Sequence, residues 1–285
     1  MNTTEQLLHL ERYLRALGPV AVAVSGGVDS MTLAIVAHRV NNNSKMYHAV
    51  SPAVPDAATE RVQRYADKEN WQLRIVNARE VEDRRYRRNP VNRCYYCKNN
   101  LYSTVSVDLA SFESKLTIAS GTNLDDLEDY RPGLVAAEEH KVRHPYVEAG
   151  IDKNSIRAIA KLLQLTDLQE LPAAPCLASR VTTGIAIDEK LLPVIDRVET
   201  TVWENFGESL SLSAVRCRIL PDKVSIQLQG ELDFDLGHLD FPLIQSTVKT
   251  LLSEAGYNQY QIVTVDPYRR GSAFRAETIE VVNLG

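Results

Sequence analysis

The chain has 285 residues, of which 44% are hydrophobic and 24% charged, and its formal net charge is −5 at pH 7. This length suits one large core or two modest ones, and the acidic balance argues against a protein that mainly binds nucleic acid through phosphate contacts. Because no stretch approaches a membrane span or a signal peptide, we expect a cytoplasmic protein without a membrane partner, in which clustered cysteines bind metal or do redox chemistry.

The first two thirds of the chain alternate helix-like and strand-like segments. The N-terminal segment predicts an amphipathic helix with a threonine cap and with Leu7, Leu10, Leu14 and Leu17 on one face. Strands are then predicted at 19–24, 45–51, 73–78 and 115–121, and helices at 30–38, 56–71, 134–140 and 153–163. Short apolar strands separated by helices predict an α/β fold with a parallel sheet and crossover helices.

The pattern changes after Gly184. A helix at 188–204, a hairpin of strands 214–220 and 224–229, a helix at 241–255 and a strand at 260–266 follow in that order. They predict a smaller α+β domain of about 100 residues. The boundary falls in the loop "PAAPCLASRVTTG", so we expect one domain at 1–184 and a second, for substrate binding or oligomerisation, at 185–285.

A turn with two glycines joins the first strand to its helix, in "VAVAVSGGVDSMTLAI". Strand, glycine turn and helix together aim backbone N–H groups at an anion. Gly26 and Gly27 permit close approach of the backbone, Ser25 and Ser30 add hydroxyl donors, and Asp29 could bind Mg²⁺ or orient the turn. The Walker A and G-x-G-x-x-G patterns are both absent, which argues against a P-loop kinase and a Rossmann dehydrogenase.

A second polar segment, "ASGTNLDDLEDYRPGL", follows the fourth predicted strand. Gly121 and Thr122 come where that strand ends, at the sheet edge where ligands of open α/β sheets bind. Asp125 and Glu128 could instead form a solvated acidic turn, whereas we expect Arg131 to take part in the site.

Three of the four cysteines suggest a metal site. Cys94 and Cys97 have the spacing C-x-x-C, and Cys176 lies in the inter-domain loop, whereas Cys217 falls on the apolar side of "VRCRI" and is predicted to be a core residue. The readings left open are ligands of a [4Fe–4S] cluster, a zinc site completed by a histidine, or unligated thiols. On three thiolates a cluster would keep one iron open to hydrosulfide, and a thioredoxin-like redox pair fits the context poorly.

Taken together, these motifs resemble a known family. "SGGVDS" is similar to the signature of the PP-loop ATP pyrophosphatases, and "NRCYYCK", "GTNLDDLEDYRPGL", "PCLASR" and "VRCRI" follow in the order seen in LarE-type ATP-dependent sulfur transferases. The resemblance implies the PP-loop, adenine nucleotide alpha hydrolase-like fold. It also implies an enzyme that adenylates a carboxylate or carbonyl of a pyridinium mononucleotide-like small molecule and replaces oxygen by sulfur from a [4Fe–4S] cluster.

The resemblance also implies roles for individual residues. Lys98 would neutralise phosphate or developing charge, and Asp29, Cys176 and Arg180 would act in catalysis. ATP phosphates and Mg²⁺ would be bound by Ser25, Gly26, Gly27, Asp29, Ser30 and Gly121. The cluster would be held by Cys94, Cys97 and Cys176, and the phosphate of the substrate by Ser179, Arg180, Arg216 and Arg218, with Arg269 and Arg270 as weaker candidates. For these arginines the alternative is a solvated surface charge.

Two stretches depart from the family pattern, "VTTG" at 181–184 and "SIQ" at 225–227, where Gln227 replaces a carboxylate that could bind metal. We therefore expect the chemistry to be retained while the acceptor stays open, and a thiolase of another heterocycle such as a purine is an alternative. A tRNA thiolase is a further alternative, because Arg84 to Arg93 could touch phosphates. An ammonia-using ligase and an inactive nucleotide-binding regulator complete the alternatives. The expected partners are a small-molecule acceptor, a sulfide source such as a cysteine desulfurase, and further copies of the chain.

Overall fold

The computed structural model describes residues 2–112, 115–128, 131–172, 175–232, 240–269 and 271–272. The chain divides into two compact units, of which the first is Met1–Asp83 with Asn92–Ala174 and the second is Arg84–Val91 with Pro175–Gly285. The second unit therefore takes a short segment from within the sequence of the first. The functional roles expected for 1–184 and 185–285 stay predictions, because compactness does not show what each part does.

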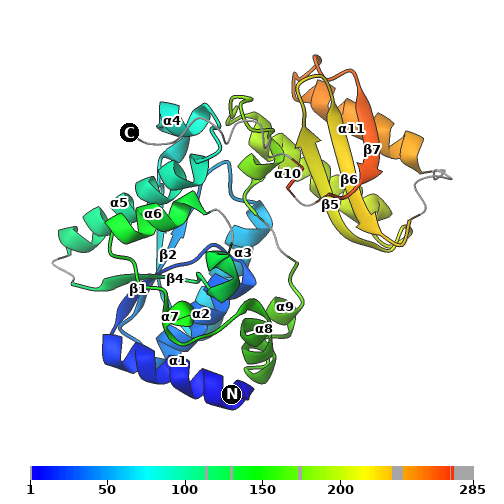
Figure 1. The fold of residues 1–285 in the computed structure, drawn as a ribbon. Helices are drawn as coiled ribbons and strands as arrows, with labels where there is room; N and C mark the ends of the chain where they lie inside the picture. Colours follow the sequence, from blue (N-terminus) through cyan, green and yellow to red (C-terminus); the bar gives the residue numbers. More distant parts are fainter. Residues whose placement is uncertain are drawn as a thin grey trace. The chain divides into compact units, whose positions relative to one another are not determined.

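The first unit is built on a four-stranded parallel sheet (Figure 1), which confirms the predicted fold class. Its strand order is β3-β2-β1-β4. At the carboxyl end of β1, Ala23 is in register with Tyr47 on one side and with Ser120 on the other. All four strands were predicted from the sequence: β1 (Val20–Ala23), β2 (Lys45–Ala49), β3 (Gln72–Val76) and β4 (Thr117–Ser120).

Alternating side chains of β1 divide the core between the two faces of the sheet. Val20 and Val22 pack into one hydrophobic cluster, and Ala21 and Ala23 into another. The helices that contribute to the first cluster are α1 (Thr3–Leu17), α2 (Val28–Val40), α3 (Asp56–Glu69), α7 (Pro145–Glu148), α8 (Lys153–Leu162) and α9 (Thr166–Gln169). Those that contribute to the second are α5 (Arg93–Ser111) and α6 (Pro132–Glu139). Figure 1 shows α5 and α6 across the sheet from α1 and α2.

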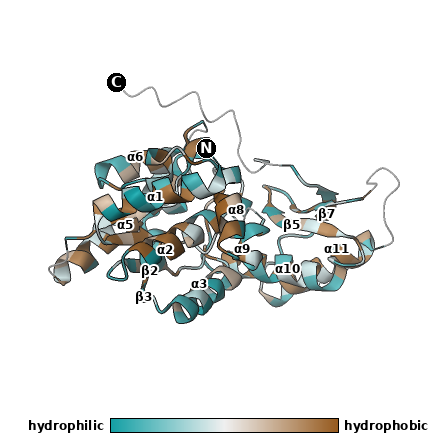
Figure 2. Cartoon of the chain, turned by 90° about the horizontal axis from the view of Figure 1, so that it is seen from below, coloured by the Kyte–Doolittle hydropathy of each residue, from teal (hydrophilic) through white to brown (hydrophobic). Residues whose placement is uncertain are grey.

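Several helix starts differ from the predictions; α6, for example, begins at Pro132 and not at 134, and the helix predicted at 188–204 begins at Leu191. The N-cap of α1 is Asn2, which forms a capping box with Glu5, so the predicted threonine cap is wrong. The reason is local: the Asn2 side chain can accept from the Glu5 N–H, which places Thr3 inside the helix. Helix α2 begins at Val28, two residues before the predicted start, and it is buried along most of its length; Figure 2 shows that much of it is hydrophobic.

Helix α5, which carries the C-x-x-C pair, was not predicted. Its residues Leu101, Tyr102, Val105 and Leu109 are buried against the sheet. Shorter helical turns complete the first unit, namely η1 (Glu80–Glu82) and η2 (Leu124–Leu127). Among the described residues, no helix is long and apolar enough to cross a membrane.

The second unit contains a three-stranded mixed sheet in the order β5-β6-β7. Strands β5 and β6 are antiparallel, which confirms the predicted hairpin, and β7 pairs with β6 in parallel. The elements of this unit are α4 (Arg84–Arg87), η3 (Leu177–Arg180), α10 (Leu191–Phe206), β5 (Leu212–Ile219), β6 (Val224–Gly230), α11 (Phe241–Glu254) and β7 (Val263–Pro267).

Candidate functional site

The glycine turn lies between β1 and α2, with Gly26 at φ 81°, in the left-handed region that favours glycine. A β-carbon on Gly26 would lie 2.7 Å from the backbone oxygen of Ala58, so the turn packs tightly against the start of α3. A β-carbon on Gly27 would meet nothing closer than Ser25 Oγ at 3.6 Å. Gly26 is thus required by packing, whereas Gly27 borders open space.

The two serines of the turn, Ser25 and Ser30, are hydrogen-bonded to each other. Ser30 Oγ lies 3.0 Å from Ser25 Oγ, accepts a hydrogen bond from the Ser25 N–H at 3.0 Å, and contacts the Gly27 carbonyl at 3.2 Å. Gly27 is the N-cap of α2 and makes no side-chain cap hydrogen bond. Because the first N–H groups of a helix have no partner within it, the N-terminus of α2 can donate to an anion.

Asp29, the second residue of α2, lies beside this N-terminus. Its Oδ2 is 3.5 Å from Lys153 Nζ, while its Oδ1 is buried and has no hydrogen-bond partner. Burial raises the pKa of the Asp29 carboxyl, against the opposing charge of Lys153. An unsatisfied carboxylate oxygen at an anion-binding helix end fits a divalent cation that accompanies phosphate.

The strand order places this turn at the switch point of the sheet. Connections lead from β1 to β2 and β3 on one side, whereas β4 pairs with the other side of β1, and ligands of open α/β sheets bind at such a reversal. Gly121, directly after β4, comes so close to α2 that a β-carbon there would lie 2.8 Å from the Ser30 nitrogen. The predicted residues Gly121, Asp29 and Ser30 are therefore brought together.

Further polar groups gather where β4 ends. Ser120 Oγ lies 2.9 Å from His144 Nδ1 and 3.0 Å from Thr122 Oγ1. Burial lowers the pKa of His144, and the nearby charge of Lys98 acts in the same direction. Lys98, predicted to act on phosphate, is thus placed near the end of β4.

Two cations at the turn were not predicted. Besides Lys153, Arg61 of α3 donates from Nη1 to the Gly26 carbonyl at 2.8 Å and so fixes the orientation of that peptide. Neither residue belongs to a motif, since they reach the turn from 35 and 124 residues away in sequence. Of the acidic turn, Asp125 and Glu128 are exposed, and Arg131 forms an ion pair with Asp126 at 2.7 Å.

The C-x-x-C pair lies in the first turns of α5. Cys94 and Cys97 are three residues apart on one helix, which puts them on the same side, and both are half-buried. The backbone of α6 approaches this helix closely, since a β-carbon on Gly133 would lie 3.1 Å from Lys98 Cγ. A helix N-terminus also favours anionic groups such as thiolates.

Cys176 and Cys217 both belong to the second unit but differ in accessibility. Cys176 is half-buried and is the N-cap of η3. Cys217 is 0% exposed, which confirms that it is a core residue, and burial raises the pKa of its thiol. Within the described ranges, no group of three or more His, Cys, Asp or Glu side chains is arranged to hold a metal ion.

Arg180 is committed to an internal ion pair. It is 2% exposed, and its Nε and Nη2 donate to the two carboxylate oxygens of Glu199 at 2.9 and 2.8 Å. Burial opposes the charge of Arg180, but the hydrogen bonds that it donates to Glu199 outweigh this effect and raise the pKa of Arg180. Glu199 also accepts the Cys217 N–H at 2.7 Å, so it ties η3 and α10 to β5. No motif in the sequence points to Glu199.

Arg216 and Arg218 lie near this pair on β5. Arg218 is 6% exposed and donates to the Ser179 carbonyl at 2.7 Å and to Gln227 Oε1 at 3.3 Å, so the solvated alternative is wrong for it. Burial, and then the charge of Arg180, lowers the pKa of both Arg216 and Arg218. Three arginines close to one glutamate leave an excess of positive charge that suits a bound anion. Of the weaker candidates, Arg269 is exposed and Arg270 lies outside the described residues.

The departure "VTTG" has a structural explanation. Val181, Thr182 and Thr183 are buried, and Thr182 bonds to the Ile219 carbonyl through both its N–H and its hydroxyl. The side chain of Asn89 donates to the carbonyls of Val181 and Thr182 at 3.2 and 3.0 Å. Residues 181–183 therefore connect β5 to the segment that contains Asn89, within the second unit.

Comparisons with known proteins give three relatives, and no model of a protein family matches the chain. The chain is 35% identical over 227 residues to the "Uncharacterized protein slr1717" of Synechocystis sp., covering 79% of this chain and 82% of the relative. It is 25% identical over 213 residues to the "Uncharacterized protein MJ0830" of Methanocaldococcus jannaschii, covering 75% and 79%. It is 26% identical over 260 residues to the pyridinium-3,5-bisthiocarboxylic acid mononucleotide synthase of Lactiplantibacillus plantarum, covering 90% of each chain.

Proposed function

We propose that this chain, which belongs to the family of slr1717 and is a distant homologue of the pyridinium-3,5-bisthiocarboxylic acid mononucleotide synthase, is an ATP-dependent sulfurtransferase. It would adenylate a carboxylate or carbonyl of a small molecule and replace oxygen by sulfur. The observation that carries the proposal is the uncapped N-terminus of α2 beside the unsatisfied Asp29 oxygen, at the switch point of the sheet.

The first half-reaction follows from this turn. A carboxylate oxygen of the acceptor attacks the α-phosphorus of ATP, so that a P–O bond forms to the acceptor and pyrophosphate leaves. The N–H groups at the start of α2 and the Ser30 hydroxyl would bind the departing phosphates, and Asp29 Oδ1 would hold Mg²⁺. Lys98 and Lys153 would neutralise charge that develops on the phosphate oxygens.

In the second half-reaction, hydrosulfide attacks the activated carbon and AMP leaves with the former acceptor oxygen. The three accessible thiols, of Cys94, Cys97 and Cys176, fit an iron–sulfur cluster by donor chemistry, whereas the buried Cys217 does not. We propose that these three cysteines hold a [4Fe–4S] cluster, which supplies an open iron that can bind hydrosulfide. The chain's own part is to keep the three thiols accessible.

Arg216 and Arg218 are proposed to bind a phosphate group of the acceptor, together with Ser179. Arg180 has its guanidinium occupied by Glu199 and by the Pro175 carbonyl, so we assign it the task of placing its neighbours. A phosphate-bearing acceptor is in keeping with the mononucleotide in the name of the relative from L. plantarum. Gln227, which contacts Arg218 and Ser272, is where the acceptor could differ.

The test uses anaerobically reconstituted protein with ATP, Mg²⁺ and sulfide, and a panel of pyridinium carboxylate mononucleotides and purine nucleotides. AMP, pyrophosphate and the mass change of each acceptor are measured. We expect AMP and a thiolated pyridinium acceptor; thiolation of a purine alone would support the heterocycle alternative, and thiolation of added tRNA alone the tRNA alternative. ATP binding without AMP release would contradict the proposal and support a regulator.

The cysteine assignment has a separate test. Cys176→Ala is expected to abolish sulfur transfer while AMP still forms, whereas Cys217→Ala keeps sulfur transfer. Iron and sulfide are measured in both variants and in Cys94→Ala. Intact thiolation by Cys176→Ala, or incorporation of ammonia in place of sulfide, would contradict the cluster proposal.

A further inference from the structure

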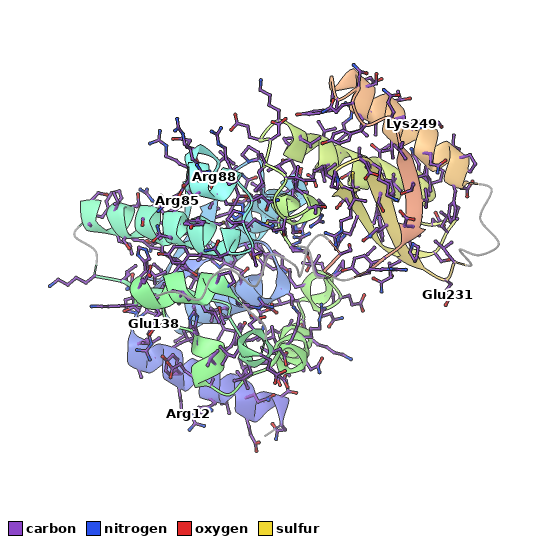
Figure 3. All side chains as sticks on the ribbon, turned by 45° about the horizontal axis from the view of Figure 1, so that its top comes forward. Arg12, Arg85, Arg88, Glu138, Glu231 and Lys249 are labelled. Carbon is purple, nitrogen blue, oxygen red and sulfur yellow. The ribbon has the colours of Figure 1, made fainter. Side chains whose placement is uncertain are left out.

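Four exposed arginines lie within five residues of the sequence. We use the name arginine face for the exposed side chains on and just after α4, namely Arg84, Arg85, Arg87 and Arg88. Figure 3 shows the side chains of Arg85 and Arg88 directed away from the ribbon. Among the described residues, no ion pair is found for Arg84, Arg87 or Arg88. So many like charges on one short segment repel one another, in a chain whose net charge is −5.

The segment that carries the arginine face is held in place by buried side chains and by hydrogen bonds within the second unit. Tyr86 is 1% exposed and Asn89 is 0% exposed. The Asn89 side chain donates to three carbonyls between Val181 and Ile185, at 3.0 to 3.2 Å. Backbone hydrogen bonds join Gly184 N–H to the Asn89 carbonyl and Ile187 N–H to the Arg87 carbonyl. The backbone that carries the arginines is therefore fixed, which lowers the conformational entropy lost when they bind a partner.

We propose that the arginine face is the docking surface for an acidic segment of a partner protein. Guanidinium groups bind carboxylates in a bidentate way. Nucleic-acid binding is dominated by phosphate contacts, in some proteins about 6–10 of them, whereas this face has four arginines, and the excess of acidic residues in the chain repels a long polyanion. Four exposed arginines on one short segment suit a short acidic segment of a protein better than a long polyanion.

The kind of partner follows from where the segment is attached, and this step rests on the proposed function. The Asn89 side chain donates to the carbonyl of Val181, and Val181 lies five residues after Cys176 in the sequence. An extended chain of that length spans about 18 Å, so Val181 and Cys176 lie no farther apart than this. The proposed reaction consumes sulfide near Cys176. A protein that carries labile sulfur and docks on the arginine face would release it close to where it is used.

The experiment measures binding of a fluorescent glutamate-rich peptide to the full chain by anisotropy. The test variant is R84Q/R87Q/R88Q, and the matched control is R12Q/K161Q/K249Q, which removes equal charge from exposed residues of α1, α8 and α11; Figure 3 labels Arg12 and Lys249. We expect the test variant to bind about tenfold more weakly and the control to bind like the wild type. Binding should weaken between about 0.05 M and about 0.2 M NaCl.

Two further probes decide between polyanions: a single-stranded RNA of the same charge and vesicles containing phosphatidylserine. Stronger binding of either probe than of the peptide, or equal losses in the two triple variants, would overturn the proposal. AMP release with inorganic sulfide as sulfur source should be the same in R84Q/R87Q/R88Q and the wild type. Absence of AMP in the wild type itself would refute the proposed function and leave the peptide result standing.

Discussion

The glycine turn of the first unit differs from a cluster in the second unit, made of Arg180, Arg216, Arg218 and Glu199, in how far its polar groups are satisfied. At the turn, one Asp29 oxygen has no partner and the N-terminus of α2 has no side-chain cap. In the cluster, Arg180 and Glu199 satisfy each other through two hydrogen bonds, and Arg218 donates to a backbone carbonyl. The turn therefore leaves polar groups unsatisfied, whereas Arg180, Glu199 and Arg218 are satisfied by groups of the chain itself.

This difference separates two kinds of functional residue. Groups left unsatisfied in the folded chain should be needed for chemistry and dispensable for stability. Groups that satisfy one another should be needed for stability, and act on a ligand mainly through the positions they fix. Four predictions test the contrast.

The largest effect is expected from Asp29→Asn. Removing the charge that would hold the cation should lower AMP formation by about a thousandfold. Stability should not fall, because burial raises the Asp29 pKa, which means that a charge on this side chain costs more free energy in the folded chain than in the unfolded one. AMP release and the thermal midpoint are measured, with the exposed Asp67→Asn as control. A large loss of stability would show that Asp29 belongs to the satisfied class.

Glu199→Gln should act mainly on stability. It leaves the Arg180 charge buried without compensation, since the two side chains are 12% and 2% exposed, and breaking such a pair costs about 3–5 kcal/mol. The chain has one tryptophan in each unit, Trp71 and Trp203. Urea unfolding followed by the signal of each tryptophan should show the loss of stability at Trp203. The exposed Glu189→Gln is the control, and an equal loss at both reporters would contradict a local effect.

The two glycines of the turn should differ. Gly26→Ala is expected to destabilise the first unit by about 2 kcal/mol, because φ is 81° and the new methyl group meets the Ala58 carbonyl. Gly27→Ala has room and a negative φ, so it should fold normally and yet weaken ATP binding. Calorimetric binding of ATP together with urea unfolding checks both. Normal ATP binding by Gly27→Ala would place the nucleotide elsewhere.

The smallest effect is a pH dependence confined to the first unit. Burial lowers the pKa of His48 and of His144, while the described residues of the second unit include no histidine. Since the unfolded chain binds these protons at about pH 6.5, stability present above that pH is lost as the pH falls below it. Unfolding followed by Trp71 should show this loss and Trp203 should not. His48→Gln should reduce it, and a loss confined to Trp203 would contradict it.

Much of the site could be predicted because its residues act locally. The serines, glycines and Asp29 are contiguous, and their roles depend on one strand, one turn and one helix start. The parallel sheet follows from short apolar strands, and the core position of Cys217 from the period-two pattern of its strand. Such features need only neighbouring residues to be recognised.

What escaped prediction depends on contacts between distant residues. Helix α5 is rich in Tyr, Asn, Ser, Thr and Val, which form helices poorly by themselves, and packing of its buried face overrides that tendency. Lys153 reaches Asp29 across 124 residues. Glu199 is one of many acidic residues on a helix, and only the fold shows that it balances Arg180.

The inserted segment Arg84–Val91 makes the polypeptide pass between the two units three times. A truncation after residue 174 would therefore remove the carbonyls to which the Asn89 side chain donates. The second unit cannot be exchanged by a single recombination event, as a simple C-terminal module could be. Variation in acceptor or partner within this family is thus expected to arise by substitutions inside both units. Because the two units are interleaved in the sequence, they are inherited together.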